Sequence, residues 1–238
     1  KAKRRPGRLG SQIFPAQLML MSSLRSLTLD LGGDDLEQWF HAMQKPWQHY
    51  FPSLARLELS PADPLNNNFP VHARTLPDGL ERLKFLSISY DVALLPQNLT
   101  SLHSTLSVWP KDALHAHNSP NLPQLQSLSL FILDCRRNTI EKLPQTLTAL
   151  TLYLVRSSNT MNNISRIIPP SVTHLQLTLR EEPTETDPQA VTFATLENLK
   201  HLKLNSYRWT CHLDRDSLPS SIESMELSVP FHNSTRLV

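Results

Sequence analysis

Cysteine, glycine and long apolar stretches are all scarce in this chain. Its 238 residues include two cysteines, Cys135 and Cys211, which is too few for a disulfide framework. The five glycines form no GxGxxG or GxxxxGK motif, which excludes the glycine-rich loops that bind nucleotide phosphates. No stretch approaches 18 consecutive apolar residues, so we predict no membrane span.

Positive charge is concentrated at the N-terminus. The chain has 23 basic and 21 acidic residues, and five of the basic ones lie within the first eight positions. The remainder therefore holds 18 basic against 21 acidic side chains, which gives no general attraction to nucleic acid. We interpret residues 1–16 as a basic segment or linker. We do not expect the chain to bind nucleic acid, and this segment is the one part for which such a role stays open.

An apolar triplet with the spacing LxxLxL dominates the rest of the sequence. Successive copies start 19 to 30 residues apart, a period typical of solenoid proteins. The fourth copy is degenerate, since it reads LTSLHS. The nine copies start at Leu24, Leu54, Leu80, Leu99, Leu125, Leu147, Val172, Leu199 and Ile222.

The triplet predicts one short strand in each copy. Its last four positions alternate between apolar and other residues, as in a half-buried strand. The connections between copies are long enough for neighbouring strands to be parallel. We therefore expect a curved parallel sheet, with the apolar residues buried beneath it and the intervening residues on its concave face.

The connections carry signals of their own. Five copies are preceded by the pattern apolar-Pro-x-x-apolar, and proline there ends any helix before the strand. Acidic residues followed by an apolar stripe predict a helix over 34–43 that ends before Pro46, and a second short helix is expected at 110–116. The segments 61–70 and 180–188 are polar and are predicted to be loops.

The repeat resembles that of leucine-rich repeat proteins over residues 17–238, in the LPxxLxxLxL form of bacterial effectors and amoebal proteins. The resemblance implies an α/β fold, a solenoid of about nine repeats with short helices and irregular loops on its convex face. The family usually has asparagine three residues beyond the triplet, where this chain has other residues. Secreted members usually have disulfide-bonded caps, and neither end of this chain has the cysteines for one, so we expect an intracellular protein, cytoplasmic or nuclear. Because no clear cap ends the repeat array, we also expect a segment of a longer chain.

Alignment of the copies predicts which side chains are neighbours on the concave face. Phe131 and Tyr153 fall side by side and resemble an interface anchor, although ordinary cross-strand stacking would look the same. His174 and His201 also fall together, but two histidines without a third ligand make a poor metal site, so no metal is predicted. The predicted partner-binding residues are Phe131, Tyr153, His174, Gln176, His201, Lys203 and Glu226.

The charged residues of this face are expected to form solvated charge pairs. They are Arg56, Glu58, Arg82, Lys84, Lys203 and Glu226.

The sequence contains no catalytic constellation. Asp134 and His212 are only sequence neighbours of Cys135 and Cys211, whereas a nucleophile and its base must meet in space. We therefore predict a protein that is not an enzyme and needs no cofactor, a scaffold whose concave face binds another protein. Two alternatives stay open: the substrate-recognition part of a ubiquitin-ligase adaptor or effector, and a structural spacer.

Overall fold

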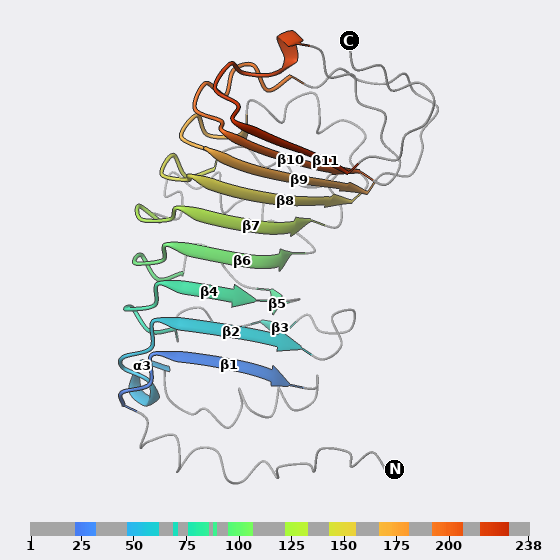
Figure 1. Cartoon of the computed structure of the whole chain (residues 1–238). Coiled ribbons are helices and arrows are strands. Elements are labelled where there is room, and N and C mark those ends of the chain that lie inside the picture. Colours follow the sequence, from blue (N-terminus) through green and yellow to red (C-terminus); the bar gives the residue numbers. More distant parts are fainter. Residues whose placement is uncertain are drawn as a thin grey trace, which may run out of the picture.

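The chain forms a parallel β-solenoid. In the computed structural model the described residues are 22–31, 47–61, 69–70, 76–85, 88–89, 95–106, 122–132, 143–155, 167–180, 192–206 and 215–228. Nine strands make one sheet, stacked in chain order with every arrow pointing the same way (Figure 1). They are β1 (Ser26–Leu31), β2 (Arg56–Pro61), β4 (Arg82–Phe85), β6 (Ser101–Leu106), β7 (Ser127–Ile132), β8 (Ala149–Val155), β9 (His174–Arg180), β10 (His201–Ser206) and β11 (Ser224–Ser228).

The prediction of one parallel strand per copy is confirmed. Each strand begins at the residue before the second apolar position of its triplet, and the degenerate fourth copy still forms β6. Residues pair with the same position of the next copy throughout, so Leu57 lies opposite Leu83 and Leu150 opposite Leu175. A shift of one residue would turn the apolar set outward, so burial specifies this register.

The core is a continuous stack of the three apolar positions of each triplet. From the second copy to the eighth, the residues at these positions are at most 2% exposed, for example Leu80, Leu147 and Leu177 at 0%. The end of the array is less well covered, because Met225 on β11 is 42% exposed. Each coil therefore buries its apolar residues against its two neighbours, as expected of a repeat array.

A tight turn leads into every strand from β2 onward. The N–H of the first apolar residue donates to the carbonyl three residues earlier, at 2.9–3.3 Å. In five copies that carbonyl belongs to a proline, such as Pro77 or Pro169. In the others it belongs to Phe51, Leu122 or Leu196, each buried. The proline pattern thus marks the first residue of a turn.

A backbone carbonyl at each strand entrance joins one copy to the next. The residue before the strand accepts two N–H bonds from the following copy, as when the Thr148 carbonyl accepts from Thr173 and His174 at 2.9 and 3.0 Å. The arrangement repeats without interruption along the array. The eight accepting residues are Arg25, Ala55, Glu81, Thr100, Gln126, Thr148, Thr173 and Lys200.

Side chains reinforce this edge of the sheet. The Ser171 hydroxyl donates to the Leu147 carbonyl at 2.7 Å, and Ser221 donates to Leu199 in the same way. The Asn198 amide reaches the Pro170 carbonyl at 2.9 Å. These bonds lie at the entrance of each strand, whereas the asparagine positions considered from the sequence follow the strand.

The fourth copy carries a local defect. Ser104 occupies the third apolar position, is 1% exposed, and its hydroxyl has no hydrogen-bond partner among the described residues. Its register neighbour Phe85 is the only phenylalanine at this position of any copy. Phe85 is 0% exposed, so the largest and the smallest side chains found at this position lie next to each other in the buried layer. Within the described part of the chain the buried Ser104 hydroxyl is unsatisfied, which costs stability.

Small elements outside the main sheet were not predicted. A four-residue helix, α3 (Trp47–Tyr50), lies directly after Pro46, where the sequence suggested only a helix end, and its Trp47 packs against Phe51. The loop prediction for 61–70 is wrong at both ends, because Pro61 is the last residue of β2 and β3 (Phe69–Pro70) pairs in parallel with β5 (Ile88–Ser89). A 3-10 turn, η4 (Arg215–Ser217), precedes the last copy.

Other expectations fall outside the described residues. The helices at 34–43 and 110–116 and nearly all of the loop at 180–188 lie there, as do parts of both predicted domain segments, 1–16 and 17–238. The α part of the predicted α/β class therefore stays a prediction. No helix of the described residues is long and apolar enough to cross a membrane.

Equivalent positions of the repeat should differ in their contribution to stability. Leu175 is 2% exposed between two strands, whereas Met225 occupies the same position on the last strand. We expect Leu175→Ala to lower the free energy of unfolding by about 2–5 kcal/mol and Met225→Ala by less than about 1 kcal/mol, measured by urea unfolding. Equal losses for the two variants would contradict the stacked core.

Candidate functional site

One face of the nine-stranded sheet is lined by the side chains that alternate with the buried residues. We call it the open face. It corresponds to the predicted concave face, and its side chains form rows that run across the strands because the register never shifts. One such row is Ser26, Arg56, Arg82, Ser101, Ser127, Ala149, His174, His201 and Ser224.

The predicted aromatic pair is confirmed as a contact. Phe131 on β7 lies opposite Tyr153 on β8, and their rings stack with centroids 4.2 Å apart and planes 15° from parallel. Both side chains are half-buried, so part of each ring stays open to solvent. A polar pair follows in the same row, where the Asn205 amide donates to the Thr178 hydroxyl at 3.2 Å.

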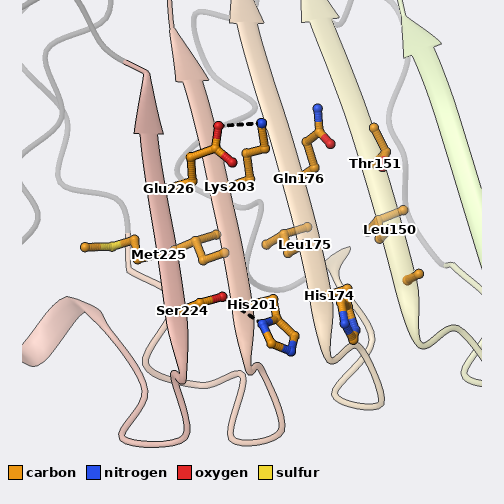
Figure 2. A pocket seen from close by; sticks show the side chains of 12 residues that line it. Leu150, Thr151, His174, Leu175, Gln176, His201, Lys203, Ser224, Met225 and Glu226 are labelled. Carbon is orange, nitrogen blue, oxygen red and sulfur yellow. Dashed lines mark hydrogen bonds and ion pairs between the residues drawn. The ribbon is translucent and has the colours of Figure 1, made fainter.

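A shallow groove of about 410 Å³ crosses β8 to β11 on the open face. It brings together five of the seven predicted binding residues (Figure 2), and Phe131 and Tyr153 are not among the residues that line it. The five are His174, Gln176, His201, Lys203 and Glu226.

The two histidines are neighbours, as predicted. His174 and His201 lie opposite each other on β9 and β10, with ring centroids 4.3 Å apart and planes tilted by 33°. The His174 Nδ1 is 2.9 Å from the Thr173 hydroxyl, and the His201 Nδ1 is 2.7 Å from the Ser224 hydroxyl (Figure 2). Each ring therefore has one nitrogen in a local hydrogen bond, and among the described residues no hydrogen bond engages the other nitrogen.

Ion pairs join neighbouring copies of the repeat near the C-terminal end of the sheet. On the open face, the Lys203 ammonium lies 2.6 Å from a Glu226 carboxylate oxygen, as drawn in Figure 2. The Lys200 ammonium lies 2.7 Å from a Glu223 carboxylate oxygen at the strand entrances, directly before β10 and β11. The hydrogen bond from Lys200 lowers the pKa of Glu223, although the pair is exposed. Exposed pairs of this kind contribute little to stability.

Near the other end of the sheet, Glu58, Lys84 and His103 stand in one row on β2, β4 and β6. Glu58 and Lys84 form an ion pair. Partial burial lowers the pKa of His103 below its ordinary value of 6.5, and the nearby Lys84 charge lowers it further. Burial and the Lys84 charge thus favour the neutral form of His103.

The expectation of charge pairs is right for Glu58 with Lys84 and for Lys203 with Glu226. It is wrong for Arg56 and Arg82, because the register places these two cations opposite each other. The alignment of the repeat copies placed Arg56 and Arg82 correctly on this face. The mistaken assumption was that each charged residue of the face pairs with an opposite charge.

The described residues contain no group of three or more histidine, cysteine, aspartate or glutamate side chains that could hold a metal ion. The residues considered around the two cysteines, Asp134, Cys135, Cys211 and His212, lie outside the described ranges.

Neither a known protein family nor a curated protein matches this chain. Any functional proposal therefore depends on the repeat pattern and on the geometry of the open face.

The lowered pKa of His103 predicts a pH dependence of stability. A histidine with a lower pKa in the folded state than in the unfolded state does not reduce stability at pH values above the unfolded pKa. The free energy of unfolding begins to fall as the pH drops through about 6.5, and this loss is complete once the pH is below the folded pKa. Between about pH 7.5 and about pH 5.5, His103→Gln should therefore lose less unfolding free energy than the wild type.

Urea unfolding at both pH values measures this difference. His49→Gln is the matched control, because His49 is an exposed histidine in the described part of the chain. An identical pH dependence for wild type and His103→Gln would show that burial of this ring does not perturb its titration.

Proposed function

We propose that the chain is a leucine-rich repeat scaffold that binds another protein through its open face. The repeat spacing, the proline turns and the parallel coils support the family assignment, which was made from the sequence. The observation that carries the binding role is the stacked pair of Phe131 and Tyr153, whose partly exposed rings lie on an otherwise polar surface.

Two stacked rings are well suited to anchoring a partner. Aromatic side chains provide large contact areas with few rotatable bonds, and they are enriched where binding energy concentrates. Stacking at 4.2 Å restricts both rings before a partner arrives, so less conformational entropy is lost on binding. The sheet beneath is fixed by a buried core, since Leu130 and Leu152 are both 1% exposed.

The groove over β8 to β11 supplies the polar part of the proposed surface. His174 and His201 each offer a ring nitrogen, and the Gln176 amide can both donate and accept. Lys203 and Glu226 are exposed and form a charged border. An apolar anchor beside a polar, solvated region resembles the core and rim of protein interfaces.

The alternatives place different demands on the same surface. A substrate-recognition part of a ubiquitin-ligase adaptor or effector would use this face in the same way and would need a recruiting or catalytic domain elsewhere. A structural spacer needs no exposed anchor, and the Phe131–Tyr153 stack argues against it.

The scaffold hypothesis predicts that partner capture depends on the aromatic pair. The double variant Phe131→Ala/Tyr153→Ala should stay folded, since both residues lie on the open face, and should lose partners that the wild type captures from lysate. Truncation of anchoring aromatics typically costs about 2 kcal/mol or more, which corresponds to roughly a thirtyfold loss of affinity.

A matched control lies two residues earlier on the first of these strands. Ser129 on β7 is on the open face and is not among the residues that line the groove, so Ser129→Ala tests the same strand without the rings. This control should retain the partners. If the aromatic double variant is folded by circular dichroism and captures everything that the wild type captures, the proposed surface is wrong.

A further inference from the structure

Two arginines face each other on the open face near the N-terminal end of the sheet. Arg56 on β2 and Arg82 on β4 are register partners, and both side chains are exposed. They alternate with the buried Leu57 and Leu83, so they stand on the same side of the sheet. Adjacent strands are about 4.8 Å apart, which brings two positive charges close together.

This arrangement is unfavourable without a counter-charge. Like charges directly opposite each other destabilise a sheet. The nearest carboxylate in the adjoining row is that of Glu58, which is paired with Lys84. No described acidic side chain forms an ion pair with Arg56 or Arg82. Nothing in the packing requires these side chains, because both are exposed.

Hydroxyl groups flank the two arginines on either side. Ser26 lies opposite Arg56 on β1, and Ser101 lies opposite Arg82 on β6. The row therefore reads serine, arginine, arginine, serine over four adjacent strands. All four side chains can donate hydrogen bonds, and no carboxylate interrupts them.

We infer that this row, Ser26, Arg56, Arg82 and Ser101, is a binding site for a phosphomonoester dianion. The planar guanidinium group donates in pairs to phosphate oxygens, and two such groups match the charge of about −2 on a phosphorylated side chain. The flanking hydroxyls donate to the remaining oxygens. Binding of the dianion removes the repulsion between the two arginines, so the ligand stabilises the sheet that binds it.

A phosphorylated protein segment fits the row better than nucleic acid does. A nucleic-acid strand needs cations repeated along its path, whereas the row continues on β7 and β8 with Ser127 and Ala149, which carry no charge. A protein-borne phosphate also suits a surface that binds protein, and this choice of source rests on the proposed function. The anion site itself does not, because it is argued from the row alone.

Calorimetric titration of the purified chain at low salt tests the inference. The probes are a five-residue peptide with central phosphoserine, its unphosphorylated form, inorganic phosphate and single-stranded oligothymidylate. The wild type should bind the phosphopeptide and not the unphosphorylated peptide. Arg56→Gln/Arg82→Gln should weaken phosphopeptide binding by at least about tenfold, since it removes both charge-assisted donors.

Arg180→Gln is the matched control. Arg180 is an exposed arginine at the end of β9, distant from the row, and its replacement changes the charge in the same way. It should leave the affinity within about twofold. An equal loss in Arg180→Gln, no saturable binding of either phosphate probe, or tighter binding of the oligothymidylate than of the phosphopeptide would overturn the proposal.

The two phosphate probes separate the sources of the ligand. If the phosphopeptide binds at least as tightly as inorganic phosphate, the result supports a phosphate group attached to a protein. If only inorganic phosphate binds, the proposal that the phosphate is attached to a protein is wrong. Phe131→Ala/Tyr153→Ala should bind both phosphate probes like the wild type. A negative result in this titration therefore rejects the anion site alone. The aromatic binding surface is tested by the capture experiment, so either proposal can be rejected without the other.

Discussion

A backbone carbonyl at the entrance of every strand accepts two N–H groups from the following copy, and the rest of the structure depends on this contact. It recurs eight times with donor–acceptor distances of 2.8–3.1 Å. Each contact aligns the first residue of a strand with the first residue of the next, so one register is passed along the whole sheet. Within that register the leucines stack into one core and the alternating side chains form straight rows.

These rows explain how an irregular repeat produces ordered surfaces. The spacing between copies varies from 19 to 30 residues, yet the variation is confined to the connections between strands. Along a row, the residue types of adjacent copies alone decide which side chains meet. Two rings stack at β7 and β8, and two histidines meet at β9 and β10. Two arginines lie opposite each other at β2 and β4. The open face therefore carries distinct chemistry at different points along the array.

Alignment of the triplets was enough to predict the strands, their order and the neighbours in each row, because period-2 burial leaves no freedom in register. It missed the hydrogen bonds of Asn98, Thr146, Ser171, Asn198 and Ser221 to the preceding copy. A signal was present, since seven of nine copies have serine, threonine or asparagine directly before the first apolar residue. Helix α3 and the β3–β5 pair were missed because they depend on packing of connections that the repeat does not specify.

The site could be predicted as positions but not as interactions. The sequence placed Arg56 and Arg82 on the face. The lack of a carboxylate for these arginines and the partial burial of His103 depend on side-chain packing and pairing. The alignment of the copies did predict that Phe131 neighbours Tyr153 and that His174 neighbours His201. Both pairs are register partners on adjacent strands.

Disulfide cross-linking between neighbouring strands tests the register most directly. In a chain with Cys135 and Cys211 replaced by serine, Thr151→Cys/Gln176→Cys places two thiols at register partners. Their Cα atoms should be about 4.8 Å apart, within the range that a disulfide spans. Thr151→Cys/His174→Cys is displaced by two residues and should stay reduced under the same mild oxidation, with free thiols counted by mass spectrometry. Cross-linking of the displaced pair in preference to the aligned pair would contradict the shared register.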